Sequence, residues 1–535
     1  MIRVFESLNN EKSASPPPLL GRTKVGGITT LPPIPTFPHK WGRSFFVSDA
    51  IKSAILIPLL VGLLNLTGCM VGPDYRQPET KVSDSFANKD FKKYKEDSIE
   101  IFWWRGYEDE ELNKLIDLVL KGNLNIKIAT ARLLEARSLR TGTTLELFPI
   151  IDSEGSYTRQ RFSRQTGFGF GTAGAEREFN LFDAGFDASW ELDFFGRVRR
   201  SIEAESAEVE AALASRRDII VSLLAETARN YFELRGTQNQ LEVARRNAKN
   251  QQETFDLTNA LLKGGRGTDL DTSRANAQLK STLATIPPLE AQVKSTVHRL
   301  SVLAGKQPDV LYNELLEPKP LPDLPEFVSV GNPTELLRRR QDIRFAERSL
   351  AAATARIGVA VADLFPRVTL FGSLGLSADT FTGLGDNGAD RFAIGPSITW
   401  AAFDLGRVKA RIDASDARAQ AALSEYELTV LTALEETENS LIDFAKELER
   451  RDYLKEAADS SEKAVELSRL RYKFGVSDFL TVLDAERRLL EAQDELARSE
   501  TRTATALVAV YKALGGGWEI GESNQYGSKT INYTE

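Results

Sequence analysis

The sequence contains very few residues that carry metal-binding or nucleophilic chemistry. Among 535 residues there are one cysteine, two methionines and two histidines. His39 lies upstream of the cleavage site predicted below, so the mature chain would keep only His298. Zinc sites, Cys–His pairs and Ser–His–Asp triads need several such side chains. We therefore expect no catalytic residue, no metal site and no enzymatic activity, and one cysteine allows no disulfide within a chain.

The sequence also lacks an excess of positive charge. The net charge is −8, which excludes the basic footprint of a nucleic-acid-binding protein, so no nucleic acid partner is expected. Hydrophobic residues make up 42% and charged residues 27% of the chain. This balance excludes both a wholly disordered protein and a polytopic helical membrane protein.

The single cysteine ends an apolar segment near the N-terminus. Lys52 precedes SAILIPLLVGLLNLTGC, a run that is short for a membrane span but suits a secretory signal. Small residues before Cys69 resemble a bacterial lipobox, in which the thiol accepts a diacylglyceryl group. We predict that residues 1–68 are an N-terminal extension and lipoprotein signal peptide, and that Cys69 carries diacylglycerol and an N-acyl lipid, with no other cofactor. The alternative is a short membrane anchor with an incidental cysteine.

The second half of the chain repeats the first. Trp190 and Trp400 are 210 residues apart, whereas the matching Phe-Pro pairs, 148–149 and 365–366, are 217 apart. Further along, Leu270-Asp271 matches Leu483-Asp484 at a spacing of 213. Small changes of spacing place insertions in loops, so we interpret the chain as two copies of one unit. The predicted segments are 69–110, an extended N-terminal part of the mature protein, 111–326, repeat 1, 327–518, repeat 2, and 519–535, a C-terminal tail.

Each copy changes its periodicity in the same order. A helical stretch, 110–147 in the first copy and 333–364 in the second, ends at Phe-Pro because proline disfavours helix at the residue before it. Apolar side chains then alternate with polar ones, as along 182–192. This two-residue period predicts β-hairpins at about 150–193 and 367–403.

The helical period returns after each hairpin. Apolar residues recur at steps of three and four, as in a coiled-coil seam, which predicts long helical hairpins at about 196–308 and 406–514. No strong breaker interrupts 407–472, so one helix there would be ~100 Å long. A coiled-coil protein alone would not explain the β-hairpins.

The isolated hairpins suit an outer membrane. An ordinary half-buried sheet also alternates, but Trp190 and Trp400 stand at the hairpin ends, where an aromatic girdle would lie at the membrane interface. Gly196 and Gly406 would allow the turn into the following helix. Four strands cannot close a barrel and an open edge is not tolerated in lipid, whereas three chains give twelve strands. The predicted fold is α+β: a trimeric 12-stranded transmembrane β-barrel, four strands per chain, continued by long α-helical coiled coils.

Phrases along nearly the whole mature chain match one family. They include CMVGPDYRQP (69–78), SWELDFFGRVRR (189–200), LLRRRQDIRFAERSLAAATARIGVA (336–360) and YKALGGGW (511–518). With them the chain resembles TolC-like outer membrane efflux proteins, in the NodT/OprM-type lipoprotein subgroup of resistance-nodulation-division efflux systems. Gln341 departs from the pattern, which usually has proline at this helix start.

The resemblance implies the exit duct of a tripartite efflux pump, which conducts substrates passively across the outer membrane. It implies a homotrimer that is lipid-anchored in the outer membrane, contacts its lipid and extends into the periplasm as a long α-helical coiled-coil tunnel. The expected partners are a periplasmic adaptor (membrane fusion protein) and an inner-membrane resistance-nodulation-division pump. The alternative is a periplasmic coiled-coil adaptor or scaffold lipoprotein, which predicts one helical hairpin between lipoyl-like β halves rather than a duplicated unit.

The resemblance also implies a gate at the periplasmic helix tips, formed by Tyr472, Leu480, Asp484 and Asp271. Leu480 and Asp484 are four residues apart and share a helix face. Around a threefold axis they would form a leucine ring and a carboxylate ring, and such a carboxylate ring favours cations. Asp271, on the other hairpin, would tether the closed state. The alternative is that Asp484 is an ordinary solvated helix residue.

The turn between the helices of each hairpin is expected to contact the adaptor. The residues of these turns are Gly264, Gly265, Arg266, Gly267, Lys473, Gly475 and Ser477. Glycines permit tight turns, and that role alone is an alternative explanation for them. In TolC an arginine stands where this chain has Ser477, so we do not expect the salt-bridge latch of that arginine.

Overall fold

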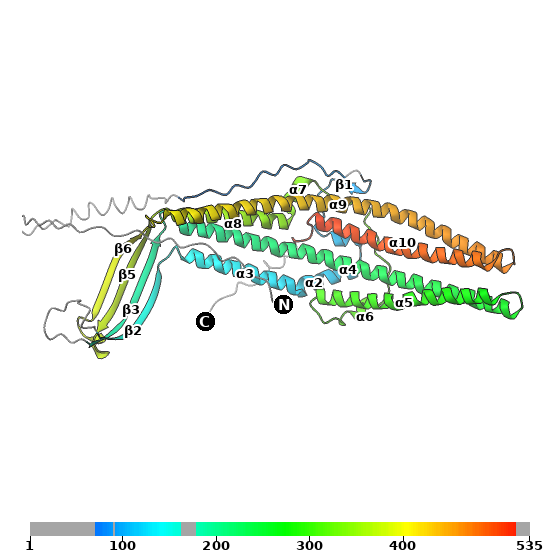
Figure 1. The fold of residues 1–535 in the computed structure, drawn as a ribbon, viewed down its shortest axis with the longest axis horizontal. Coiled ribbons are helices and arrows are strands. Elements are labelled where there is room, and N and C mark those ends of the chain that lie inside the picture. Colours follow the sequence, from blue (N-terminus) through cyan, green and yellow to red (C-terminus); the bar gives the residue numbers. More distant parts are fainter. Residues whose placement is uncertain (1–69, 89–90, 162–177, 520–535) are drawn as a thin grey trace, which may run out of the picture. The chain divides into compact units, whose positions relative to one another are not determined.

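The computed structural model describes residues 70–88, 91–161 and 178–519. These residues belong to one compact unit, residues 66–535. The predicted extension 1–68, the predicted lipid-attachment residue Cys69 and residues 520–535 lie outside the described part. Within this unit, a four-stranded sheet lies at one end of a set of long helices, and two helical turns lie at the other end (Figure 1).

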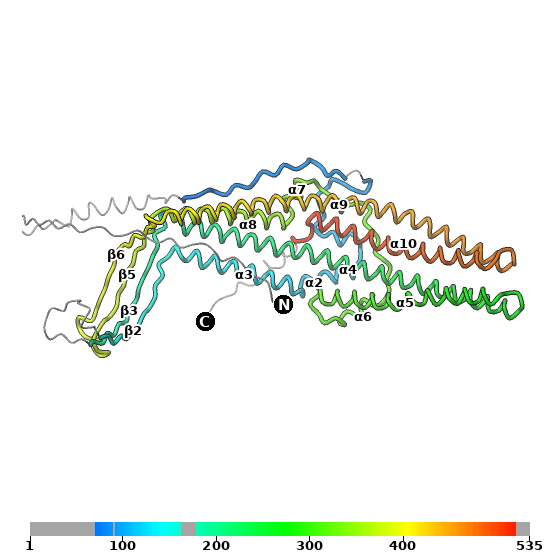
Figure 2. Tube along the Cα trace, viewed as in Figure 1, coloured from blue at the N-terminus to red at the C-terminus, as the bar shows by residue number. Residues whose placement is uncertain are grey.

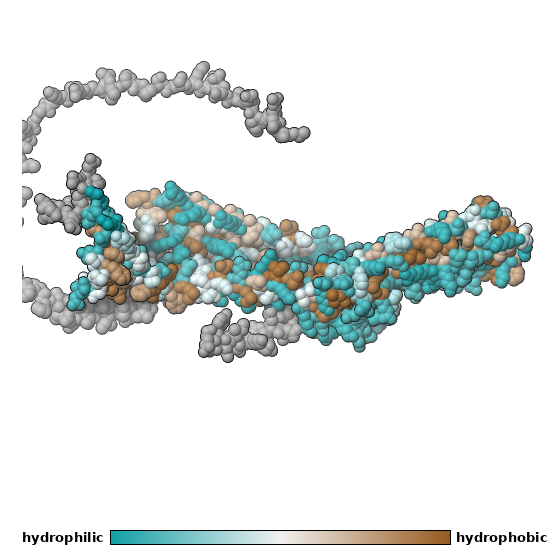
Figure 3. Space-filling model, turned by 90° about the horizontal axis from the view of Figure 1, so that it is seen from below, coloured by the Kyte–Doolittle hydropathy of each residue, from teal (hydrophilic) through white to brown (hydrophobic). Residues whose placement is uncertain are grey.

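The sheet is antiparallel, with the strand order β2-β3-β5-β6. Its strands are β2 (Ile150–Arg161), β3 (Glu178–Leu192), β5 (Arg367–Ala378) and β6 (Asp390–Thr399). Because side chains alternate along a strand, the register that pairs Phe186 with Leu374 and Trp190 with Leu370 brings the apolar residues to one face. Phe392 and Ile394 of β6 extend that face. The residues of this face that are more than half exposed are Phe186, Leu374, Phe392 and Ile394. Figure 3 shows apolar side chains gathered on the sheet.

The helices form a layer in which long helices alternate with pairs of shorter ones. The long helices are α4 (Arg197–Lys263, 67 residues) and α9 (Leu405–Lys473, 69 residues). The shorter ones are α3 (Leu124–Leu145), α5 (Asp269–Leu303), α8 (Gln341–Ala362) and α10 (Phe479–Ala513). Helices α3 and α5 pack on α4, whereas α8 and α10 lie between α4 and α9. The backbone trace shows α8 and α10 following one another along the same line (Figure 2).

A short helix precedes α3 and another precedes α8, so each helical stretch predicted over 110–147 and 333–364 consists of two helices. Helix α2 (Glu110–Gly122) ends at Asn123 and helix α7 (Pro333–Arg339) ends at Arg340, whose ψ angles are 131° and 127°. Asn123 donates to the carbonyl oxygen of Leu303 at 2.8 Å, and Arg340 donates to that of Ala513 at 2.9 Å. Each break therefore caps the end of the helix that returns from the tip, α5 or α10.

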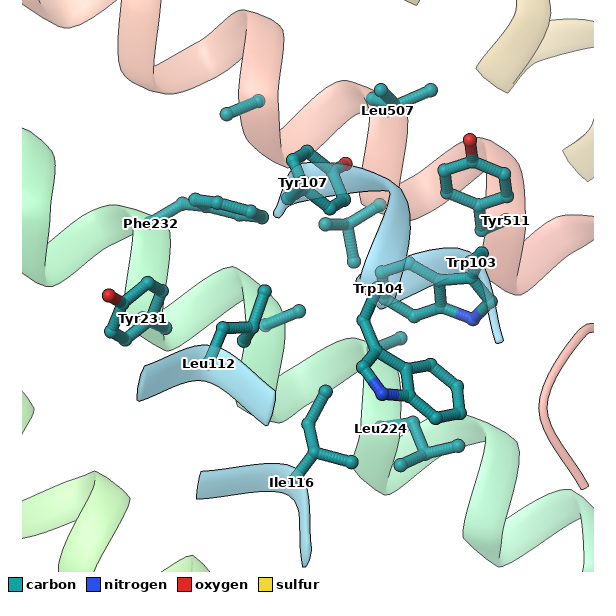
Figure 4. Close-up of a cluster of buried hydrophobic side chains, with 14 of the residues drawn as sticks. Trp103, Trp104, Tyr107, Leu112, Ile116, Leu224, Tyr231, Phe232, Leu507 and Tyr511 are labelled. Atoms are coloured by element: carbon teal, nitrogen blue, oxygen red, sulfur yellow. The ribbon is translucent and has the colours of Figure 1, made fainter. Parts of the chain in front are cut away.

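The main hydrophobic core lies midway along α4, where α10 ends. The 3-10 helix η1 (Trp103–Tyr107) inserts its aromatic rings there, together with α2, α6 (Tyr312–Leu315) and the two short paired strands β1 (Tyr94–Lys95) and β4 (Val328–Ser329). Trp103 stacks on Tyr511 with ring centroids 5.0 Å apart, and Tyr107 packs on Phe232 (Figure 4). This core joins the N-terminal segment to both repeats.

Candidate functional site

The two helical turns are equivalent residue by residue. Gly265 and Gly475 have φ angles of +72° and +75°, and the helices that follow begin at residues 269 and 479. The amide of Arg266 donates to Leu261 and that of Val476 to Arg471, at 2.8 and 2.9 Å. The two turns are thus 210 residues apart.

This equivalence corrects the spacing of 213 that the sequence suggests here. At a spacing of 210, Asp271 corresponds to Thr481, Leu270 corresponds to Leu480, and the counterpart of Asp484 is Arg274. The sequence comparison matched a Leu-Asp pair in each copy, but the turns and the helix starts fix the alignment three residues earlier.

The turn glycines have different structural roles. Gly265 and Gly475 are in the left-handed region, where a side chain is strained. A Cβ at Gly267 would lie 2.8 Å from the amide nitrogen of Leu262, whereas one at Gly264 would meet only an ordinary contact. Ser477 takes the place of Gly267 in the second turn. The side chains of Arg266 and Lys473 are exposed beside these turns; their contact with an adaptor stays a prediction.

Leu480 and Asp484 share one face of α10, as their spacing predicts. Val482, Glu486 and Leu489 are buried on the opposite face, while Leu480 is 53% exposed. The Asp484 carboxylate accepts from two arginines of its own helix. Arg487 approaches one oxygen at 3.1 Å and the Nε of Arg488 approaches the other at 2.9 Å. Sequence reasoning missed both arginines, although spacings of three and four residues on a helix are a recognised signal.

Tyr472 and Asp271 come together from different hairpins. Tyr472 packs on Phe479 in a small cluster with Ala275 and Val482. Burial and the charge of the Asp271 carboxylate raise the pKa of Tyr472. Asp271 also accepts a hydrogen bond from the Thr268 hydroxyl at 2.7 Å. The structure thus groups these two predicted gate residues, and separates them from the exposed face of Leu480 and Asp484.

A buried ion pair lies a short distance from the turns and was not predicted. Glu486 is 5% exposed and accepts from Arg469 at 2.6 Å and from the Thr254 hydroxyl at 2.7 Å. Arg469 also donates to the carbonyl of Asn250. These contacts join α4, α9 and α10, and a buried carboxylate needs such partners.

A cavity of about 580 Å³ adjoins this ion pair. Leu257 and Thr254 of α4 line one side, Val465 and Arg469 of α9 line the other, and Val482 and Leu489 belong to α10 between them. Since Val482 lies opposite Leu480 on α10, the cavity opens on the face away from Leu480 and Asp484, and Tyr472 of the predicted gate set lines it.

The predicted interface residues lie where the sheet meets the helices. The indole N–H of Trp190 donates to the carbonyl of Leu147 at 2.8 Å, and that of Trp400 to Leu364 at 3.0 Å. Gly196 has a φ of +79°, and a side chain there would collide with Met70. Gly406 differs, because it lies in the first turn of α9 with open space around it. Its predicted role in a turn is wrong.

None of the helices within residues 70–88, 91–161 and 178–519 is long and apolar enough to cross a membrane.

Comparison with known proteins gives the same family for both repeats. The model of the outer membrane efflux protein family matches residues 115–306 and 332–516. Nodulation protein T of Rhizobium leguminosarum bv. viciae is 31% identical over 466 residues, which cover 87% of this chain and 93% of that protein. Outer membrane protein OprJ of Pseudomonas aeruginosa is 30% identical over 477 residues, covering 88% and 98%.

Solved structures of outer-membrane channels share the fold. The outer-membrane channel OprN superposes with a TM-score of 0.79 and 42% identity, covering 84% of this chain and all of that one. The open state of the Neisseria gonorrhoeae MtrE channel gives a TM-score of 0.71 and 30% identity, covering 84% and 99%. Together with the duplicated hairpins and the sheet described above, these matches show that the chain belongs to the outer membrane efflux protein family.

Proposed function

We propose that this chain is the exit duct of a tripartite efflux pump, a trimeric outer-membrane channel that conducts substrates passively and is gated at its helical tips. The observation that carries the proposal is the pairing of an open, apolar-faced sheet with two equivalent long helical hairpins. A periplasmic adaptor or scaffold would need neither. Membership of the efflux protein family supports the same function.

The exposed edges of the sheet and of the helix layer support a trimer. Strands β2 and β6 are the outer strands of the described sheet, and an unpaired edge is not tolerated in lipid. Three copies of this four-stranded sheet supply the twelve strands of a closed barrel. The outer helices of the layer carry exposed leucines as well, at Leu134 and Leu139 of α3 and at Leu428 and Leu431 of α9. Joining α3 of one copy to α9 of the next would cover them.

The position of the N-terminus supports a lipid anchor at Cys69. Met70, the next residue, packs against Gly196, and the amide of Val71 donates to Phe195 at 3.2 Å. Both contacts lie at the turn from β3 into α4, beside Trp190, where the membrane surface would be. An acyl chain on Cys69 would therefore start at the level of the lipid.

The tips support a gate and an adaptor contact. Leu480 and Asp484 would face the threefold axis, while Tyr472 with Asp271 and Arg469 with Glu486 would hold the hairpins together in the closed state. On the opposite face, the cavity between α4 and α9 has the apolar floor and charged rim that suit a helix of a partner. We assign this surface, with the turns at Arg266 and Lys473, to the periplasmic adaptor that links the duct to its pump.

Replacing Leu480 and Asp484 together by alanine tests the gate. We expect the single-channel conductance in planar bilayers to rise about twofold or more, because a hydrophobic constriction limits ion flow. Glu466→Ala with Leu470→Ala is the matched control, a leucine and carboxylate at the same spacing that line the cavity instead. An unchanged conductance in the Leu480/Asp484 variant would rule out the gate assignment.

A further inference from the structure

The exact equivalence of the two turns changes the expected charge of the channel opening. In a trimer, each position of the turns occurs six times around the axis, three times from each hairpin. Leu270 and Leu480 are equivalent, so the leucine position is filled in both hairpins. The position of Asp484 is filled by Arg274 in the first hairpin, so carboxylates and guanidinium groups alternate there.

The carboxylate of Asp484 is also compensated within its own helix. Arg487 and Arg488 bond to its two oxygens, and their side chains are 57% and 69% exposed. Glu491 follows on the same face, 3.9 Å from Arg487. The exposed face from Leu480 to Glu491 therefore holds two acids and two arginines.

The first hairpin adds no net negative charge to the opening. Arg274 and Lys280 are exposed on α5, and the acids near its start are Asp269 and Asp271. Asp271 bonds to Thr268 and approaches Tyr472, away from the face of Leu480 and Asp484. A ring of uncompensated carboxylates would attract cations and repel anions, whereas this ring holds charges of both signs.

We propose that Arg487, Arg488 and Arg274 remove the cation selectivity of the periplasmic opening, so that anionic and zwitterionic amphiphiles pass as readily as cationic ones. The proposal rests on the proposed function, because it requires Leu480 and Asp484 to face the channel axis. It assigns the charge preference of the duct to three arginines outside the predicted gate set.

Reversal potentials across a KCl gradient test the proposal with the full-length lipidated channel in planar bilayers. We expect the wild-type channel to show little preference between K⁺ and Cl⁻. Arg487→Gln with Arg488→Gln should raise the K⁺ over Cl⁻ permeability ratio by about threefold or more, because Asp484 then lacks its partners. Adding Arg274→Gln should raise the ratio further. Arg487→Lys with Arg488→Lys keeps both positive charges and should keep the wild-type ratio. Arg356→Gln is the control for a remote arginine, since Arg356 of α8 pairs with Glu208 of α4.

Three results would overturn the proposal, and they are distinguishable. If Asp484→Asn changes the permeability ratio and the glutamine variants of the arginines do not, the gate stands and the arginines do not act on it. If none of these substitutions changes the ratio, the gate position itself is wrong, and the proposed function loses its gate as well. A strongly cation-selective wild-type channel would equally contradict the role of the arginines.

Discussion

At the scale of single residues, the two repeats differ at a position where the first repeat binds the N-terminal segment of the chain. Arg200 is 1% exposed and donates to the carbonyl of Val71 at 3.1 Å, to Asp74 at 2.7 Å and to Glu203 at 2.7 Å. Its counterpart in the second repeat is Ala410. The arginine fastens the N-terminal segment, which then lies along α8 and α9 (Figure 1).

Arg200→Ala should release this segment. We expect a loss of about 3 kcal/mol in the free energy of unfolding, because the Glu203 and Val71 oxygens lose a buried cationic partner. Thermal unfolding and limited proteolysis within residues 74–88 would measure it. Arg407→Ala is the control, since its side chain is 84% exposed and a surface pair with Asp404 contributes about 0–1 kcal/mol. Equal stability of the two variants would contradict the role of Arg200.

Sequence spacing predicted the residue pairs that lie close along one helix. It placed Leu480 and Asp484 on one face, and the same rule could have found Arg487 and Arg488. It could not find Arg469 with Glu486, because these residues approach one another only after the chain turns at Gly475. The effect of the Asp271 charge on the pKa of Tyr472 depends on the packing of two hairpins that are far apart in sequence.

At the scale of elements, the joints between stacked helices were the least predictable feature. The strands followed from alternation and the long helices from the absence of breakers. Pro396, which has no backbone donor for a ladder, lies in β6, the outer strand of the described sheet. Asn123 and Arg340 are not helix breakers by type. Their extended backbone is stabilised by the helix ends that they cap, which no local pattern reveals.

Glu436 shows how the second joint depends on pH. Burial opposes its ionisation, but the hydrogen bond and charge of Arg340 outweigh burial and lower the pKa of Glu436. A carboxylate with a lowered folded pKa stabilises the fold above its unfolded pKa, and this contribution disappears as the pH falls through the folded value.

Glu436→Gln should therefore melt at a lower temperature than the wild type at pH 7, by an amount equivalent to about 1–2 kcal/mol. The difference should shrink as the pH falls below about 4.5, the ordinary value of the carboxyl group. Calorimetry at several pH values measures both. Glu435→Gln, which changes the neighbouring carboxylate, should melt like the wild type; a difference of Glu436→Gln that persists at low pH would exclude the ionic explanation.

At the scale of the whole molecule, the sequence predicted the α+β fold class of an efflux channel, and the comparisons confirm it. The prediction succeeded because a repeated change of period leaves few architectures open. In a single chain, the edges of the sheet and of the helix layer are left without a neighbour to pack on. These exposed edges are the basis for the proposed trimer.

Leu431→Glu tests that assembly on the α9 edge. Leu431 is 65% exposed in the single chain, so glutamate is harmless to the fold of one subunit. If Leu431 is covered by α3 of a neighbour, the buried charge should cost several kcal/mol per interface and convert trimers into monomers. Native mass spectrometry in detergent measures the assembly state. A trimer of wild-type stability would refute the edge pairing.

The constant spacing between repeats has a consequence for variation in length. From Trp190 and Trp400 to the ends of α5 and α10 at Leu303 and Ala513, the spacing stays at 210, so this stretch contains no net insertion or deletion. One residue added to a long helix of only one repeat would move that tip by about 1.5 Å and rotate its inner face by about 100°. Evolution, or an engineer who lengthens the tunnel, must therefore change both copies by the same number of residues.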